Sequence, residues 1–236
     1  MLVIHTADVH IGVENYGRPD PENRTSSRLT DFLDTLDEVV AYSIDHKADI
    51  VLFCGDAYKS RNPTQTHQRE FALRVARLAS EGIQVFLLAG NHDSPNVPGP
   101  ATALDIFPTL EVGNVHIGNT LKTHLVTTKS GPLQIVALPW IRKGQFMASL
   151  DFDNSSSPPS DLLNRSIESR LTDAIRLRAS ELNPNLPSIL AGHISIDSAK
   201  TSSEKSMMLG KDYVLLKSSV ALPEFDYVAL GHIHRH

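Results

Sequence analysis

The sequence predicts an α/β fold with more than one β-sheet. Short apolar runs, each followed by a polar loop, alternate with longer segments in which apolar residues recur with helical period. Between residues 111 and 138, short alternating runs separated by turns at 118–119 and 130–132 predict a β-meander. Alternating strands and helices are typical of an α/β domain, and the extra strands indicate a second sheet.

Six apolar runs are expected to form buried strands. Each is short and ends at a polar loop that contains glycine or histidine, which is the pattern of strands covered on both faces. The runs are residues 2–4, 50–54, 85–89, 135–138, 189–191 and 227–230. Cys54 lies inside the second run and is expected to be a small buried hydrophobic side chain.

Three segments have the residue spacing of amphipathic helices. Their apolar residues fall three or four positions apart, so one face of each helix is expected to point to the core. The first contains Leu29, Phe32, Leu33, Leu36, Val39 and Val40, the second Phe71, Val75, Leu78 and Ala79, and the third Leu163, Ile167, Leu171 and Ile175. The Ser/Pro-rich stretch 155–160 before the third helix is expected to be a loop or hinge.

Composition limits the class of protein. The 236 residues are enough for a substantial core, and 22 Lys and Arg against 27 Asp and Glu give a net charge of −5. This balance excludes the global basic surface of an autonomous nucleic-acid binder, so a phosphate-bearing substrate has to be held locally. The single cysteine cannot form an intramolecular disulfide, which favours a reducing compartment, and no apolar run approaches membrane-spanning length. We therefore expect a cytoplasmic protein without a membrane-spanning segment.

Polar side chains follow five of the predicted strands at the points where those strands end. Because the carboxyl ends of strands in an open α/β sheet line the ligand crevice, we expect these groups to converge in space. Oxygen and nitrogen donors without thiolate suit Mn²⁺, Fe or Zn²⁺. In chain order the candidate metal ligands are Asp8, His10, Asp56, Asn91, His193, His232 and His234.

Seven ligands are too many for one ion that keeps a position open for substrate, so the sequence predicts two divalent ions. If one carboxylate bridges them, each ion receives four protein ligands. Asp56 is the expected bridge, because a carboxylate has two oxygens to share and the preceding Gly55 permits a tight turn. Two ions about 3.5–4 Å apart would flank an in-line displacement at phosphorus and activate a water as the nucleophile.

His92 and Asp93 are the expected catalytic residues. His92 directly follows a candidate ligand, and an imidazole is suited to protonate a leaving oxygen near neutral pH. Asp93 is expected to orient that imidazole. Basic side chains near the strand ends are expected to contact the substrate backbone, without a sequence motif that proves it. These are Lys59, Arg61, Arg142 and Lys143, together with Trp140, Lys200 and Lys205.

Five motifs, taken in order, resemble those of the calcineurin-like metallophosphoesterase superfamily. They are Asp-x-His, Gly-Asp, Gly-Asn-His-Asp, Gly-His and Gly-His-x-His. Residues 5–12, residues 90–93 and the stretch from 192 through Ser202, Glu204 and Gly210 to 234 are similar to the SbcD and meiotic-recombination-eleven branch of DNA double-strand-break repair nucleases. The resemblance extends over nearly the whole chain.

This resemblance implies a four-layer α/β/β/α metallophosphoesterase sandwich that binds two Mn²⁺ ions. It also implies 3′-to-5′ exonuclease and endonuclease activity in DNA double-strand-break repair, a homodimer, and association with an SMC-like ATPase subunit of the SbcC type. By motif position it assigns His92 as the acid. It places Asp8, His10, Asp56 and His234 on one ion, and Asp56, Asn91, His193 and His232 on the other.

Two features depart from the family pattern. Lys59 stands where some relatives have a histidine thought to help position the scissile phosphate, and a lysine binds phosphate but does not shuttle a proton near neutral pH. The chain also stops two residues after His234. Residues 1–236 are therefore expected to form a nuclease domain truncated at its C-terminal end, without the capping and ATPase-binding regions.

Two other functions are compatible with the same motifs. A phosphatase or small-molecule phosphodiesterase would use the same metal site, but residues 59–61 and Asp93 replace the Asp-Arg pair and the glutamate typical of protein phosphatases. An inactive scaffold would not need the intact set of ligands. Histidines outside the motifs are expected to be structural or solvated, namely His5, His46, His67, His116, His124 and His236.

Overall fold

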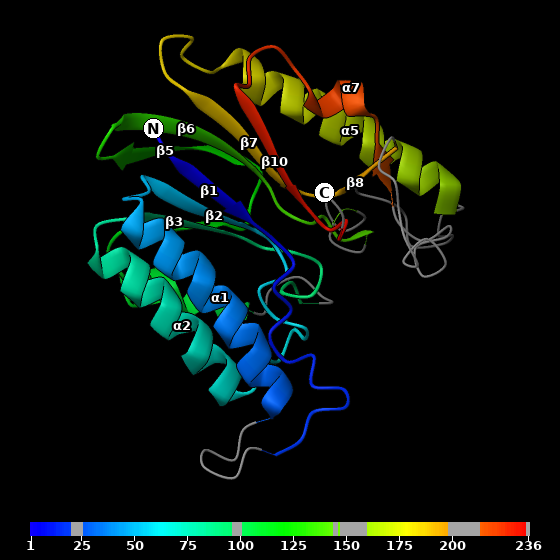
Figure 1. Ribbon diagram of the computed structural model, residues 1–236. Helices are drawn as coiled ribbons and strands as arrows, with labels where there is room; N and C mark the ends of the chain where they lie inside the picture. Colours follow the sequence, from blue (N-terminus) through cyan, green and yellow to red (C-terminus); the bar gives the residue numbers. More distant parts are fainter. Residues whose placement is uncertain (20–25, 96–100, 144–145, 147–159, 198–212, 235–236) are drawn as a thin grey trace.

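Two β-sheets packed face to face form the centre of the molecule (Figure 1). This computed structural model describes residues 1–19, 26–95, 101–143, 146, 160–197 and 213–234. Several sequence predictions fall outside these ranges. They concern the loop at 155–159, the motif residues at 202, 204 and 210, and Lys200, Lys205 and His236.

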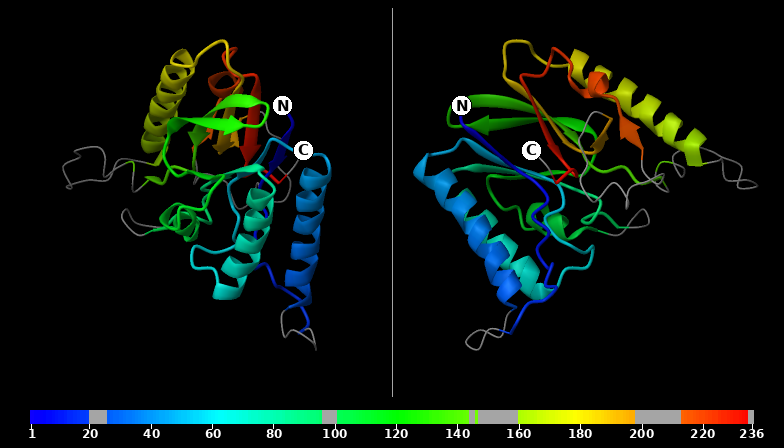
Figure 2. Two further views of the ribbon diagram at one scale, coloured as in Figure 1. Left: turned by 90° about the vertical axis from the view of Figure 1, so that its left-hand side faces the viewer. Right: turned by 45° about the vertical axis from the view of Figure 1, so that its right-hand side comes forward.

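The first sheet has four parallel strands in the order β1-β2-β3-β4. These are β1 (Val3–Thr6), β2 (Ile50–Cys54), β3 (Gln84–Leu88) and β4 (Val115–Gly118). Helices α1 (Ser27–Asp45) and α2 (Gln65–Ser80) connect the first three strands and cover the outer face of the sheet (Figure 2). Both helices follow the predicted apolar spacing, and the side chains of Ser26 and Thr64 cap their first turns.

The second sheet has the strand order β10-β7-β6-β5, and only β5 runs antiparallel to its neighbour. Its strands are β5 (Lys122–Thr128), β6 (Gly131–Leu138), β7 (Ser188–His193) and β10 (Tyr227–Gly231). Helices α5 (Ser160–Ser180) and α7 (Lys217–Val220) lie over its outer face. Shorter elements are η1 (Ala103–Asp105), α3 (Ile106–Thr109), and the paired strands β8 (Ser195–Ile196) and β9 (Val214–Leu215).

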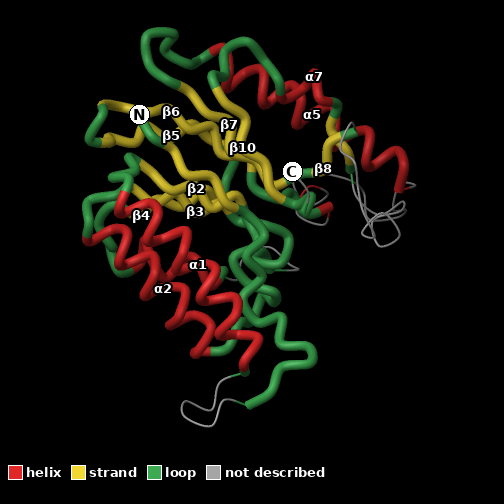
Figure 3. Tube along the Cα trace, viewed as in Figure 1, coloured by secondary structure: helices red, strands yellow, loops and turns green. Residues whose placement is uncertain are grey.

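Alternating side chains of the strands divide the core into three apolar layers. In β2, Val51 and Phe53 pack with α1 and α2, whereas Ile50, Leu52 and Cys54 pack between the two sheets. The second sheet alternates in the same way, and its outward side chains pack against α5. The layers therefore follow the order helix, sheet, sheet, helix, which confirms the predicted four-layer α/β/β/α sandwich (Figure 2, Figure 3).

The predicted β-meander at 111–138 is wrong in its pairing. Three strands form there, but β4 pairs in parallel with β3 of the first sheet, and only β5 and β6 form an antiparallel hairpin. The chain crosses from one sheet to the other at 119–121. Gly118 permits this crossing, because a Cβ there would lie 2.9 Å from Leu88 and 3.0 Å from Ala137.

Helix α5 is amphipathic, as its spacing predicts. It buries Leu163, Ile167 and Ile175 against the second sheet and exposes charged side chains such as Arg165 and Arg170. No helix in the described part of the chain has the length and apolar content to cross a membrane.

His124 is a histidine held in an apolar setting between the sheets. Its ring packs edge to face against Phe86, with ring centroids 5.0 Å apart. The Nε2 atom is shielded from solvent and has no hydrogen-bond partner among the described residues. Burial, together with the charge of Lys122, lowers the pKa of His124 to about 4.

We expect His124 to make the fold acid-sensitive. As pH falls from 6.5 towards 4, the unfolded chain binds a proton at this ring that the folded chain does not bind, so stability is lost. His124→Leu should therefore reduce the fall in the free energy of unfolding between about pH 7 and about pH 5. Urea unfolding of both proteins measures this fall. Equal falls in the variant and the parent would contradict the prediction.

Candidate metal centre

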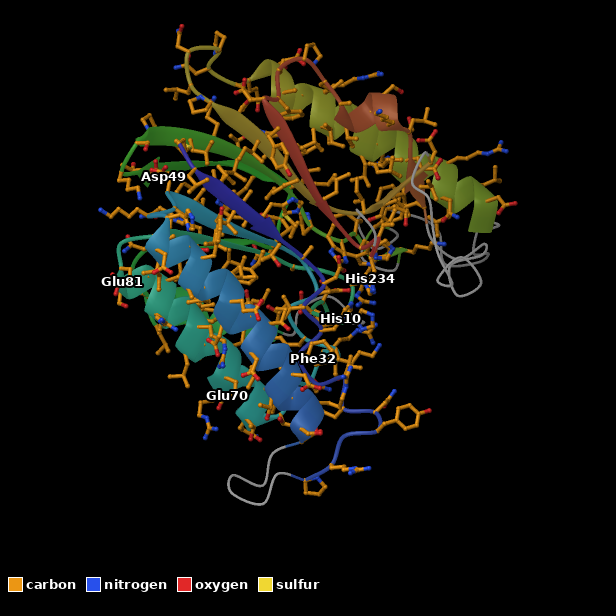
Figure 4. The ribbon with its side chains drawn as sticks, viewed as in Figure 1. His10, Phe32, Asp49, Glu70, Glu81 and His234 are labelled. Atoms are coloured by element: carbon orange, nitrogen blue, oxygen red, sulfur yellow. The ribbon has the colours of Figure 1, made fainter. Side chains whose placement is uncertain are left out.

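The carboxyl ends of five strands meet at one edge of the sandwich (Figure 1, Figure 4). The turns after β1, β2 and β3 carry donors from the first sheet, and the ends of β7 and β10 carry donors from the second. Figure 4 shows His10 and His234 close together at this edge. Their Nε2 atoms lie 3.1 Å apart, although 224 positions separate the two residues in sequence.

Asp56 lies at the centre of this cluster and is almost fully buried, with 2% of its surface exposed. Its Oδ2 atom lies 3.4 Å from Nε2 of His193 and 3.7 Å from Nε2 of His10. Its Oδ1 atom accepts a hydrogen bond from the backbone N–H of His92 at 2.8 Å. Burial acts to raise the pKa of Asp56, but His193 and this N–H outweigh it and lower the pKa to about 2. The carboxylate is therefore ionised at neutral pH.

Asp8, His10 and His234 form one group of donors. Oδ1 of Asp8 lies 3.4 Å from Nε2 of His234 and 3.9 Å from Nε2 of His10. Oδ2 of Asp8 accepts a hydrogen bond from the backbone N–H of His232 at 2.9 Å, which joins the turn after β1 to the turn after β10. Burial lowers the pKa of His10 to about 4 despite the nearby charge of Asp56. The His10 ring is therefore neutral and able to act as a ligand.

Asn91, His193 and His232 form a second group. Oδ1 of Asn91 lies 2.9 Å from Nε2 of His193 and 3.0 Å from Nδ1 of His232. The buried His193 ring donates its Nδ1–H to the carbonyl oxygen of Cys54 at 2.8 Å. Metal-bound histidines commonly make this kind of contact, which leaves the other ring nitrogen for the metal. Burial, with the charge of His193, lowers the pKa of His232 to about 3.

Four of the donors sit on left-handed backbone. Their φ angles are +55° at Asp8, +50° at His10, +53° at Asp56 and +88° at His232. Such a conformation costs a non-glycine residue on the order of 1 kcal/mol or more and persists only where surrounding contacts enforce it. Here the backbone N–H groups of Asp8 and His10 donate to the carbonyl oxygens of Gly55 and Asp56, each at 3.0 Å. The turns after β1 and β2 thus hold each other in the strained form.

Two glycines give the donors room to approach one another. Gly55 has φ +92°, and a Cβ there would lie 2.1 Å from Nδ1 of His193. A Cβ at Gly90 would lie 2.1 Å from Oδ1 of Asp56. A side chain at either position would therefore displace a candidate ligand.

The donor set fits divalent metal ions. Carboxylate and amide oxygens with neutral imidazoles suit Mn²⁺, Fe or Zn²⁺, and ligands have to be deprotonated to bind them. Among the described residues, three groups have ligand atoms within 4.8 Å of one another, namely Asp8-His10-His234, His10-Asp56-His92 and Asp8-Asp56-His193. The distribution of the seven ligands between two ions, with Asp56 as the bridge, stays a prediction.

His92 lies at the solvent side of the cluster, with 34% of its side chain exposed. Its Nε2 atom lies 4.0 Å from Oδ2 of Asp56. Its Nδ1 atom donates to the carbonyl oxygen of Lys59 at 2.9 Å, so a backbone carbonyl orients the ring. This arrangement leaves Nε2 to face the place where the candidate ligands converge.

Asp93 has other partners than the sequence predicts. Its buried carboxylate accepts hydrogen bonds from the backbone N–H groups of Ala57, Tyr58 and Gly90 at 3.3, 3.2 and 3.0 Å. Burial, with the charge of Asp56, raises the pKa of Asp93 to about 6. A carboxylate closed off from water needs several donors, and these amides supply them. The expected orienting contact from Asp93 to the imidazole next to it is therefore replaced by the contact to the Lys59 carbonyl.

The four predicted substrate-binding side chains differ in their surroundings. Lys59 and Arg61 are exposed on the loop after β2, which also carries Asp56. Lys143 is half-buried. Nη2 of Arg142 instead donates to the carbonyl oxygens of Asn91 and Ser94, the latter at 2.6 Å. Their contacts with substrate stay a prediction.

Trp140 and Tyr213 form an aromatic wall behind the second group of donors. The Trp140 ring centroid lies 4.7 Å from that of His232 and 5.3 Å from that of Tyr213. Only 9% of Trp140 is exposed, so it supports the His232 ring instead of presenting a face to solvent. Sequence reasoning missed Tyr213, because it belongs to no motif. One feature of the sequence could have indicated that Trp140 lies beside the donors, namely its position two residues after β6 at this edge.

The family model of calcineurin-like phosphoesterases matches residues 1–236, so the chain belongs to that family. Over its whole length it is 29% identical to the SbcD component of the nuclease SbcCD from Bacillus subtilis and 25% identical to that from Escherichia coli K12. It spans 57% and 56% of these two relatives, a little more than half of each. Over 39% of the chain it is 36% identical to 19% of the DNA double-strand break repair protein Mre11 of Haloferax volcanii.

Gly90→Ala should disturb the cluster by pushing against the Asp56 carboxylate. We expect a loss of stability of about 1–3 kcal/mol, as for an overpacked core, and weaker Mn²⁺ binding. Thermal unfolding and isothermal titration with Mn²⁺ measure the two effects. Gly113→Ala is the matched control, because a Cβ at Gly113 meets no atom within 4 Å. Unchanged Mn²⁺ affinity in Gly90→Ala would show that the close approach to Asp56 does not matter for binding.

Proposed function

We propose that this chain is a metal-dependent nuclease domain that hydrolyses phosphodiester bonds of DNA in double-strand-break repair, with 3′-to-5′ exonuclease and endonuclease activity. The observation that carries the proposal is the convergence of the seven donors at one edge of the sheets. The similarity to relatives named as nucleases over the whole chain supports the choice of substrate.

Two divalent ions, for which we propose Mn²⁺, would supply charge compensation and an activated water when bound. Asp56 brings buried negative charge and Asp8 partly buried negative charge to the cluster, and such charge repels a phosphate until cations compensate it. The neutral imidazoles of His10 and His232 add ligands without adding charge. The site therefore has to bind cations before it can bind an anionic substrate.

His92 is the proposed general acid. The Lys59 carbonyl holds the Nδ1 side of its ring, so the Nε2 side is left to meet the substrate. As water adds to phosphorus it loses a proton to the solvent, the bond to the leaving oxygen breaks, and that oxygen takes a proton from Nε2, which is then reprotonated from solvent. The exposed ammonium of Lys59 and guanidinium of Arg61 would hold neighbouring phosphates of a strand, since each is a cation on the loop that carries the Asp56 turn.

We also propose that the domain works as a homodimer with an SMC-like ATPase of the SbcC type. The name of the Bacillus subtilis relative describes one component of a complex, which supports a partner protein. Tyr42 and Leu73 are large apolar side chains exposed on α1 and α2, and they make these helices the candidate surface between two copies.

The substrate assignment is tested by assaying the purified chain with Mn²⁺ or Mg²⁺ on labelled single-stranded and double-stranded DNA and on bis-p-nitrophenyl phosphate. We expect metal-dependent cleavage of both the small diester and DNA. Hydrolysis of the small diester without any DNA cleavage, also in a longer protein that carries this chain, would instead assign a small-molecule phosphodiesterase or phosphatase. No hydrolysis of either substrate would indicate an inactive scaffold.

His92→Gln tests the role of the acid. Glutamine keeps a polar side chain of similar length but cannot donate a proton as an acid, so we expect turnover to fall by about 10²–10⁴ while Mn²⁺ binding is retained. Steady-state kinetics and Mn²⁺ titration measure the two properties. His67→Gln on α2 is a matched control for the loss of an imidazole away from the donors. Turnover in His92→Gln within about twofold of the parent would remove His92 from the mechanism.

A further inference from the structure

Asn91, His92 and Ser94 belong to one tight turn after β3, and that turn is held from two sides. Ser94 closes it from within, because its N–H and its hydroxyl donate to the carbonyl oxygen of Gly90 at 3.1 and 2.8 Å. The Asp93 carboxylate holds one side through the backbone N–H groups described above. The carbonyl oxygens of Asn91 and Ser94 on the turn still need donors, and Arg142 supplies them.

Arg142 reaches this turn from the other sheet. It lies four residues beyond the end of β6, and the segment before it is anchored at two backbone positions. The N–H of Trp140 donates to the carbonyl oxygen of Ala89 at 3.1 Å, and the N–H of Ile141 donates to the Tyr213 hydroxyl at 3.0 Å. The Trp140 contact to Ala89 and the Arg142 contact to Asn91 are therefore successive ties between the same two segments.

The contacts of Arg142 set it apart from Lys59 and Arg61. A guanidinium that contacts substrate has to direct its donors towards the ligand, whereas Nη2 of Arg142 donates to two backbone carbonyls and its Nε is shielded from solvent. Turning this group towards a phosphate would remove a charged donor from both carbonyls, and breaking hydrogen bonds to charged groups in a partly buried place is costly. Lys59 and Arg61 are exposed, and in the described structure their side chains do not donate to the carbonyl oxygens of this turn.

We propose that Arg142 is a positioning residue that clamps the Asn91–Ser94 turn, and not a substrate-binding residue. The inference rests on the proposed function, because the turn carries a candidate metal ligand and the proposed acid. Oδ1 of Asn91 contacts His193 and His232, and the N–H of His92 donates to Asp56. A shift of the turn therefore moves the Asn91 amide and the His92 ring. Arg142 acts on the reaction through these two residues.

Three variants of the whole 236-residue chain test the proposal. Arg142→Gln removes the charged guanidinium group, and Arg142→Lys keeps a positive charge but not the planar arrangement of donors. Arg178→Gln is the matched control, because Arg178 pairs only with the nearby Glu181 in the hydrogen bonds seen for the described residues. Circular dichroism and thermal unfolding establish that each variant is folded. If Arg142→Gln does not fold, Arg142→Lys carries the test.

The expected result separates positioning from substrate binding. With bis-p-nitrophenyl phosphate and Mn²⁺, Arg142→Gln should lower kcat about tenfold or more and change KM by less than about twofold. Mn²⁺ titration should show weaker binding at one of the two sites, since the Asn91 group is loosened and the Asp8 group is not. Millimolar guanidinium should restore part of kcat in Arg142→Gln. Arg178→Gln should match the parent in all three measurements.

A rise in KM with unchanged kcat and unchanged Mn²⁺ binding would overturn the proposal and return Arg142 to the substrate-binding set. Unchanged kcat, KM and Mn²⁺ binding would overturn it as well. Failure of the proposed function gives a different result, in which the parent binds Mn²⁺ but hydrolyses nothing. In that case the Mn²⁺ affinity of Arg142→Gln against Arg178→Gln still decides whether Arg142 holds the turn.

Discussion

Asp56 brings a negative charge to a place that is almost closed to water, and much of the surrounding structure compensates that charge. Burying a carboxylate costs several kcal/mol unless hydrogen bonds and opposite charge offset it. The offset comes from the His92 N–H, in the turn after β3 of the first sheet, and from His193 at the end of β7 in the second sheet. One buried carboxylate therefore links the two sheets, and divalent ions at the same place would strengthen that link.

The candidate metal centre and the core of the sandwich are packed against each other. Cys54 is the last residue of β2, its side chain lies in the apolar layer between the sheets, and its carbonyl oxygen accepts the hydrogen bond from His193. A Cβ at Gly231 would lie 2.0 Å from that carbonyl oxygen, so β10 also approaches this point closely. Because the donors converge only in the folded chain, ions held here would favour the folded form and stabilise the whole sandwich.

The sequence was sufficient to predict which side chains converge at one edge of the sheets, but not the contacts that hold those side chains in place. Candidate ligands such as Asp8 and Asn91 follow apolar strands, and parallel strands bring their carboxyl ends to one edge, so local pattern implies proximity. The four-layer order came from the family resemblance. The pairing of β4 was missed, because alternation indicates the buried face of a strand and not its neighbour. Arg142, and Asp93 apart from its contact with nearby Gly90, bind backbone atoms of distant turns, and no residue pattern records such contacts.

We propose that both sheets together form one dinuclear metal site around Asp56. The most direct measurement is a Mn²⁺ titration of the purified chain followed by electron paramagnetic resonance. We predict two ions per chain and, at full loading, a spectrum of two exchange-coupled Mn²⁺ ions, because a shared carboxylate holds them close together. Binding of a single ion, or of two ions whose spectra are those of isolated Mn²⁺, would contradict it.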